Sequence, residues 1–169
     1  TFFNRIVGER KAIVEDRPGV TRDRLYALVE RFELPFQLID TGGLEASPKS
    51  SIARMVVDQT MQAIEDADLI ICLFDSQVGV HPEDSEVMQV LRRAKKEVIF
   101  VANKCDDPSH HIRANDFFQL GCDAVVPISS IHGKGAEELI RQVLHKMPNY
   151  AALCQSARDL RKLREEKEK

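Results

Sequence analysis

The chain has 169 residues, of which 43% are hydrophobic and 30% charged, enough to bury the core of one compact domain. Its formal net charge of −3 gives no global electrostatic argument for a protein that binds nucleic acid or a membrane surface. No apolar run approaches the roughly 18 residues that would span a bilayer, so we expect no membrane partner.

The N-terminal part of the sequence predicts a helix, a pair of strands and a second helix. The first helix covers Thr1–Val7, and Gly8 fits the position just past its end. Two strands, Arg24–Arg31 and Pro35–Asp40, are expected to be joined by a tight turn. Apolar residues at helical spacing then predict a helix over Ile52–Ala67.

From Leu69 onward, strands and helices alternate. The continuous apolar run Leu69–Asp75 is typical of a strand that is covered on both faces. Strands separated by helices predict a parallel sheet with right-handed crossovers, and therefore a three-layer α/β domain. The remaining predicted elements are helix Pro82–Ala94, strand Val98–Ala102, helix Ile112–Leu120, strand Ala124–Ile128 and helix Gly135–Met147.

The C-terminal stretch, the cysteines and the histidines say little about function. The almost entirely charged stretch Arg158–Lys169 predicts a polar helix or a linker, because it has no core of its own. The four cysteines contain no Cys-x-x-Cys pair, which favours reduced thiols over a disulfide or a zinc site. The histidines show no ligand spacing, and we expect the adjacent His110 and His111 in a solvated loop.

A polar segment, Asn103, Lys104, Cys105 and Asp106, directly follows one buried strand. Ligands of an open parallel sheet bind beyond the carboxyl ends of its strands. The two oxygens of Asp106 would match the neighbouring N1–H and N2 amino groups of guanine, which adenine lacks. Asn103 could bond the base and tie loops together, and the stem of Lys104 could lie along the base. Alone, this pattern is only moderately specific, and a solvated turn is the alternative.

A second loop, Pro127–Gly135, follows the last predicted strand and reads "PISSIHGKG". Ser129 and the backbone N–H of Ser130 could meet a carbonyl oxygen such as guanine O6. Gly133 and Gly135 would permit the tight turn into the helix. Taken alone, an ordinary Ser/Gly helix start is the favoured interpretation.

A third loop contains "IDTGGL". Asp40 could hold a metal-bound water, and Gly42 and Gly43 would let a backbone N–H approach a phosphate. A carboxylate with Mg²⁺ is the usual hard-ion arrangement, and the hydroxyl of Thr21 could ligate the same ion. A turn with a side-chain bond from the aspartate is the alternative. The order and spacing of all three loops favour one shared site.

With "RPGVTRDR", "DTGGLE", "NKCD" and "PISSIHGKG", the chain resembles the first G domain of the EngA/Der family of P-loop GTPases. The likeness covers residues 1–150, and 151–169 would form a charged tail or linker helix. The resemblance implies GTP or GDP with Mg²⁺, GTP hydrolysis, a cytoplasmic location and action on the large ribosomal subunit. It also implies a second, tandem G domain and a C-terminal RNA-binding-like domain. Ser130 departs from the family, which more usually has alanine there.

The resemblance assigns roles to particular residues. Thr21 and Gly43 would be catalytic, and Thr21 and Asp40 would hold Mg²⁺, the latter through water. Leu44 stands where many Ras-like enzymes have a water-orienting glutamine, so intrinsic hydrolysis should be slow, and the subfamily relies on K⁺ instead. The nucleotide-binding residues would be Thr1, Asp40, Thr41, Gly42, Gly43, Leu44, Asn103, Lys104, Cys105, Asp106, Ser129 and Ser130.

The phosphate-loop pattern G-x-x-x-x-G-K-[ST] is missing, and in the family it ends one residue before the position of Thr1. We therefore expect an N-terminally truncated G domain that lacks its first, central strand. That strand belongs between the one ending at Asp40 and the one ending at Asp75. Its loss would leave a gap of two strand spacings, about 9.6 Å, lined by unpaired backbone groups. The alternative is a remnant that folds around a modified sheet and acts as an interaction module.

Overall fold

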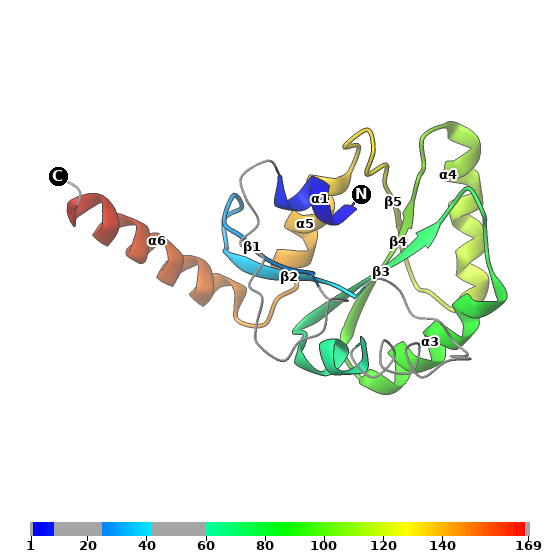
Figure 1. Ribbon diagram of the computed structural model, residues 1–169, viewed down its shortest axis with the longest axis horizontal. Helices are drawn as coiled ribbons and strands as arrows, with labels where there is room; N and C mark the ends of the chain where they lie inside the picture. The colour runs from blue at the N-terminus through cyan, green and yellow to red at the C-terminus, as the bar shows by residue number, and fades with distance from the viewer. Residues whose placement is uncertain (1, 9–24, 42–59, 168–169) are drawn as a thin grey trace.

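The computed structural model describes residues 2–8, 25–41 and 60–167 (Figure 1). Residues 60–66 form a helical segment. In chain order the other elements are α1 (Phe2–Val7), β1 (Leu25–Val29), β2 (Phe36–Asp40), β3 (Leu69–Asp75), α3 (Pro82–Ala94), β4 (Glu97–Asn103), α4 (Pro108–Ala114), a 3₁₀ helix (Asn115–Leu120), β5 (Val125–Pro127), α5 (Ala136–His145) and α6 (Tyr150–Lys167).

The strands form two separate sheets. β1 and β2 make an antiparallel hairpin in which Leu25 lies opposite Asp40. β3, β4 and β5 are parallel and lie in that order, with Asp75 opposite Asn103. Among the described residues, no ladder joins β2 to β3. The sheet is therefore divided at the place where the sequence predicts that a central strand is missing.

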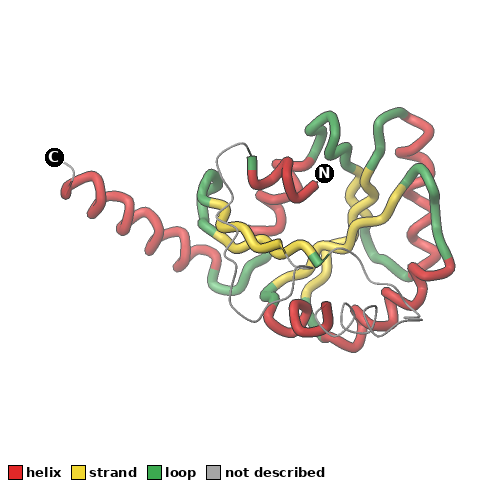
Figure 2. The backbone as a smooth tube through the Cα atoms, in the orientation of Figure 1, coloured by secondary structure: helices red, strands yellow, loops and turns green. Residues whose placement is uncertain are grey.

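Helices cover both faces of the parallel sheet (Figure 2). Successive β4 residues point to opposite faces, so Ile99 and Val101 join one core while Phe100 and Ala102 join the other. This arrangement confirms the predicted three-layer α/β fold. The hairpin-side core contains Ile6, Val29, Ile99, Val101, Ile128 and Leu139, and the α3-side core contains Phe74, Met88, Leu91, Ala102, Phe117 and Leu120.

Local capping explains why α1 ends and α3 begins where the sequence predicts. The N–H of Gly8, which has a φ of +75°, donates to the Asn4 oxygen at 3.0 Å and closes α1. At the start of α3, the His81 side chain accepts from a backbone N–H, while the Asp84 carboxylate accepts from the His81 N–H at 2.7 Å. This reciprocal cap, followed by a proline, fixes the first residue of α3.

The predicted helix Ile112–Leu120 is wrong in its start and in its type. α4 begins earlier because Asp107 caps it, accepting from the His110 N–H at 3.3 Å and from a second backbone N–H, with a proline at the first helical position. The 3₁₀ helix then takes up Asn115–Leu120. His110 and His111 thus lie in a helix and not in a loop, and the side chain of His110 is only 17% exposed.

The C-terminal helix α6 projects from the body of the molecule (Figure 1). It starts at Tyr150, whose hydroxyl donates to Glu33 at 2.6 Å. Arg161, in the second half of α6, donates to the Phe32 carbonyl at 3.1 Å, so α6 is fastened at two points to the turn between β1 and β2. The assignment of residues 151–169 to a separate tail stays a prediction. Of the described helices, none has the length and apolar character to span a membrane.

Candidate functional site

Asn103, at the end of β4, joins the loops that follow all three parallel strands. Its side-chain oxygen accepts from the N–H of Ser130 at 3.1 Å and from the Ser130 hydroxyl at 2.8 Å. Its backbone oxygen accepts from the Ser76 hydroxyl at 2.7 Å and from the Ser76 N–H at 3.0 Å. The expected loop-tying role of Asn103 is therefore observed, while its contact to a base stays a prediction.

Asp106 lies where these loops meet, with its side chain 24% exposed. The Ser129 hydroxyl donates to Oδ1 at 2.6 Å, and the Gln77 amide donates to Oδ2 at 3.3 Å. The His132 ring nitrogen is 3.9 Å from Oδ1. Each carboxylate oxygen has two acceptor positions, so one position on each oxygen is left for a ligand. The geometry fits a planar ligand edge with two adjacent donors.

Lys104 turns its side chain back toward β3. Its φ of +64° is left-handed, a conformation that costs a residue with a Cβ about 1 kcal/mol. The ammonium pairs with Asp75 Oδ2 at 2.5 Å. Burial raises the pKa of Asp75, but hydrogen bonds from Lys104 and the Gln77 N–H, together with the Lys104 charge, outweigh it and hold the pKa below its ordinary value. Next along the chain, Cys105 is buried, and its N–H donates to the Ile128 oxygen at 2.9 Å.

The loop between β5 and α5 is closed on itself. The Ser129 N–H donates to the Lys134 oxygen at 2.9 Å, and the two residues form an antiparallel bridge. Gly133 and Gly135 have φ values of +71° and +75°, as the predicted tight turn requires. Ser129 and Ser130 are almost fully buried, so their positions are fixed by the fold.

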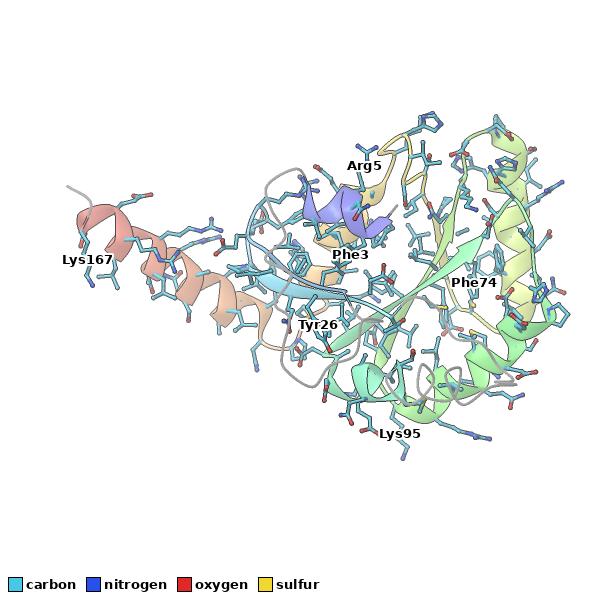
Figure 3. The ribbon with its side chains drawn as sticks, in the orientation of Figure 1. Phe3, Arg5, Tyr26, Phe74, Lys95 and Lys167 are labelled. Atoms are coloured by element: carbon cyan, nitrogen blue, oxygen red, sulfur yellow. The ribbon has the colours of Figure 1, made fainter. Side chains whose placement is uncertain are left out.

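Sequence reasoning missed two residues of this site. Arg5 of α1 donates to the Ser130 oxygen at 2.9 Å and also to the Ile131 oxygen (Figure 3). No sequence signal points to this pair, because the partners are 125 residues apart. The sequence position of Gln77 could have pointed to the site. It lies two residues beyond the end of a predicted buried strand, and ligands bind beyond the carboxyl ends of parallel strands.

Of the residues predicted to bind the phosphates and the metal ion, the structure describes only some. Asp40 is the last residue of β2, in the sheet that does not contain Asn103, and Thr41 directly follows that strand. In the described ranges, no group of three or more His, Cys, Asp or Glu side chains could hold a metal ion, and all four cysteines are buried with free thiols. Thr1, Thr21, Gly42, Gly43 and Leu44 fall outside the described residues.

Comparisons with known proteins point in one direction. Residues 1–104 match the family model of the 50S ribosome-binding GTPase. The chain is 46% identical over 153 residues to GTPase Der of Syntrophotalea carbinolica. The matched region covers 90% of this chain and 35% of that relative. The chain therefore spans about a third of the length of the curated relatives it matches.

Solved structures share the fold. An Era variant of Aquifex aeolicus bound to GDP and AlF₄⁻ superposes with a TM-score of 0.73 at 26% identity, over 88% of this chain and 52% of that one. Era in complex with MgGDPNP and a segment of 16S ribosomal RNA gives a TM-score of 0.72 at 27% identity, with the same coverage of 88% and 52%. These matches confirm the predicted P-loop NTPase-like α/β fold.

Proposed function

Because the chain belongs to the 50S ribosome-binding GTPase family, we propose that it is the guanine-nucleotide-binding domain of a GTPase that acts in assembly of the large ribosomal subunit. One observation carries the nucleotide specificity: the Asp106 carboxylate, held by Ser129, lies where three strand-end loops are tied together by Asn103. The ribosomal role is supported by the family and by the Der relatives.

Guanine would be selected over adenine by the hydrogen-bond donors and acceptors along the edge of its ring. The two remaining acceptor positions of Asp106 would take guanine N1–H and N2–H, and the stem of Lys104 would lie along the ring. Ser129 and Ser130 would lie near O6. Adenine has an acceptor at N1, which would face the carboxylate without a hydrogen, so an ATP-dependent function is disfavoured.

Hydrolysis would depend on the other end of the nucleotide. Thr21 and, through water, Asp40 offer the hard oxygen ligands that Mg²⁺ prefers, and the bound ion would neutralise phosphate charge. The Gly43 backbone N–H would meet the terminal phosphate. Leu44 cannot orient a water, so the intrinsic rate would be slow and sensitive to K⁺. The Era structures with MgGDPNP and with GDP and AlF₄⁻ support this chemistry in a relative.

The partners of the whole protein follow from its relatives. Since the chain spans about a third of their length, a second G domain and a C-terminal RNA-binding-like domain would complete the protein. Action on the ribosome would place it in the cytoplasm. Era in complex with 16S ribosomal RNA is a relative that contacts ribosomal RNA directly.

A second candidate is an interaction module that does not hydrolyse GTP, which the separation of β2 from β3 favours. A fluorescent GDP analogue separates the two candidates. The 169-residue chain should bind it weakly or not at all, because this sequence has no phosphate-loop pattern and phosphate contacts dominate nucleotide affinity. The complete gene product that contains this chain should bind it and hydrolyse GTP. Nanomolar binding by the 169-residue chain would contradict the first expectation, and no binding by the complete product would favour the module.

Asp106→Asn tests the base assignment in the complete gene product. Asparagine offers a donor to the C2 oxygen of xanthine and an acceptor to its N1–H, so preference should move from GTP toward XTP. The GTP-over-XTP ratio of affinities should fall on the order of 100-fold or more. An unchanged ratio would mean that Asp106 does not read the base.

A further inference from the structure

The loop that follows β3 contacts the segment Asn103–Asp106 almost residue for residue. Asp75, the last residue of β3, and the two loop residues after it each bond to members of that four-residue segment, yet the nucleotide-binding role proposed above uses none of the three. The pairs are Asp75 with Lys104, Ser76 with Asn103 and with Cys105, and Gln77 with Asp106.

We infer that Gln77 is a positioning residue for guanine specificity, which rests on the proposed function. Its Nε2 donates to Asp106 Oδ2 at 3.3 Å, while the Ser129 hydroxyl donates to Oδ1 at 2.6 Å. With one donor held on each oxygen, the plane of the carboxylate is fixed from both sides. One acceptor position then remains on each oxygen, and guanine supplies one donor for each.

The backbone of Gln77 is itself held on two sides. Its N–H donates to Asp75 Oδ1 at 2.9 Å, and its carbonyl accepts from Arg113 of α4 at 3.0 Å. Asp75 is in turn paired with Lys104. The amide of Gln77 therefore extends from a fixed backbone, so less conformational entropy is lost when it orients the carboxylate.

With this arrangement, discrimination between guanine and hypoxanthine depends on the orientation of the Asp106 carboxylate. Guanine needs both oxygens of Asp106 in one orientation, for N1–H and for the N2 amino group. Hypoxanthine has only N1–H, and a carboxylate that can rotate satisfies one donor almost as well as a fixed one. Loss of the Gln77 amide should therefore reduce the preference for GDP over IDP more than it reduces the affinity for IDP.

The test measures the affinity of the complete gene product for GDP and for IDP by competition with a fluorescent GDP analogue. Gln77→Met keeps the length and removes the donors, and Gln77→Glu places a like charge against Asp106. Gln142→Met is the matched control, since Gln142 donates to Glu138 at 3.4 Å on the surface of α5. We expect the GDP-over-IDP ratio to fall about three- to tenfold in Gln77→Met, further in Gln77→Glu, and not in Gln142→Met.

A ratio is insensitive to a fraction of unfolded protein, which lowers both apparent affinities alike. An unchanged ratio in Gln77→Met would overturn the inference, provided that Asp106→Asn removes the preference for GDP. If the wild-type protein shows no preference between GDP and IDP, the proposed function fails together with the inference. The two failures are thus distinguishable.

Discussion

The Arg5 guanidinium donates to the backbone oxygen of Ser130 at 2.9 Å and so fastens α1 to the loop after β5 (Figure 3). The neighbouring Ser129 holds the Asp106 carboxylate at 2.6 Å. A helix at the start of the chain thus supports the residue that we propose to read the base. Arg31 of the β1–β2 turn reinforces the same helix by donating to the Ile6 oxygen at 2.8 Å.

Arg5→Leu should lower both stability and affinity for guanine nucleotides. It leaves two loop carbonyls without their donor, so the free energy of unfolding should fall by about 1–2 kcal/mol. Arg92→Leu is the matched control, because Arg92 donates to the Leu120 oxygen at 2.7 Å on the α3 side, away from the site. Denaturant unfolding and GDP binding would be measured for both variants. Equal losses of affinity would refute a specific link between Arg5 and the site.

Phe117→Ala should destabilise the α3-side core. Phe117 is fully buried and stacks on Phe74 with ring centroids 4.5 Å apart. Truncation leaves a cavity and should cost about 3–5 kcal/mol in the free energy of unfolding. Its neighbour Phe118 is 45% exposed, so Phe118→Ala should cost less than about 1 kcal/mol. Urea unfolding of both variants measures the difference, and equal losses would contradict the observed burial of Phe117 and exposure of Phe118.

Gly135→Ala should cost more stability than Gly79→Ala. Both glycines have a left-handed φ, +75° and +81°, so each substitution carries backbone strain of about 1 kcal/mol. A Cβ on Gly135 would also lie 3.3 Å from the Ile128 side chain, whereas one on Gly79 would meet nothing within 4 Å. Thermal unfolding should show the larger fall in Tm for Gly135→Ala. The reverse order would show that crowding at the start of α5 is relieved without cost.

The ion pair of Asp75 with Lys104 should make the free energy of unfolding depend on pH in the acidic range. The pKa of Asp75 is lowered in the folded protein, so its contribution is complete above the unfolded value of about 3.9 and is lost as the pH falls through the folded value. The difference in free energy of unfolding between wild type and Asp75→Asn should therefore shrink from about pH 5 to about pH 2. A difference that stays constant across this range would rule out the assigned titration.

The elements that could be predicted from the sequence are those with strong local signals. The apolar run Leu69–Asp75 predicts the bounds of β3, and the predicted helix Pro82–Ala94 has the bounds of α3. Apolar spacing does not predict the start of α4, because the helix begins at the Asp107 cap, before Ile112. Gln77 and Arg5 could not be placed, because their bonds join segments that only the folded sheet brings together.

The separation of β2 from β3 has a consequence for how the domain opens. The described ties between the hairpin and α1 or α5 run through side chains, as when Arg31 bonds to Ile6 and to Glu137. β4, by contrast, is bonded to a strand on either side. Deuterium should therefore replace the amide protons of the hairpin through small local openings, while β4 should exchange only when the parallel sheet as a whole comes apart.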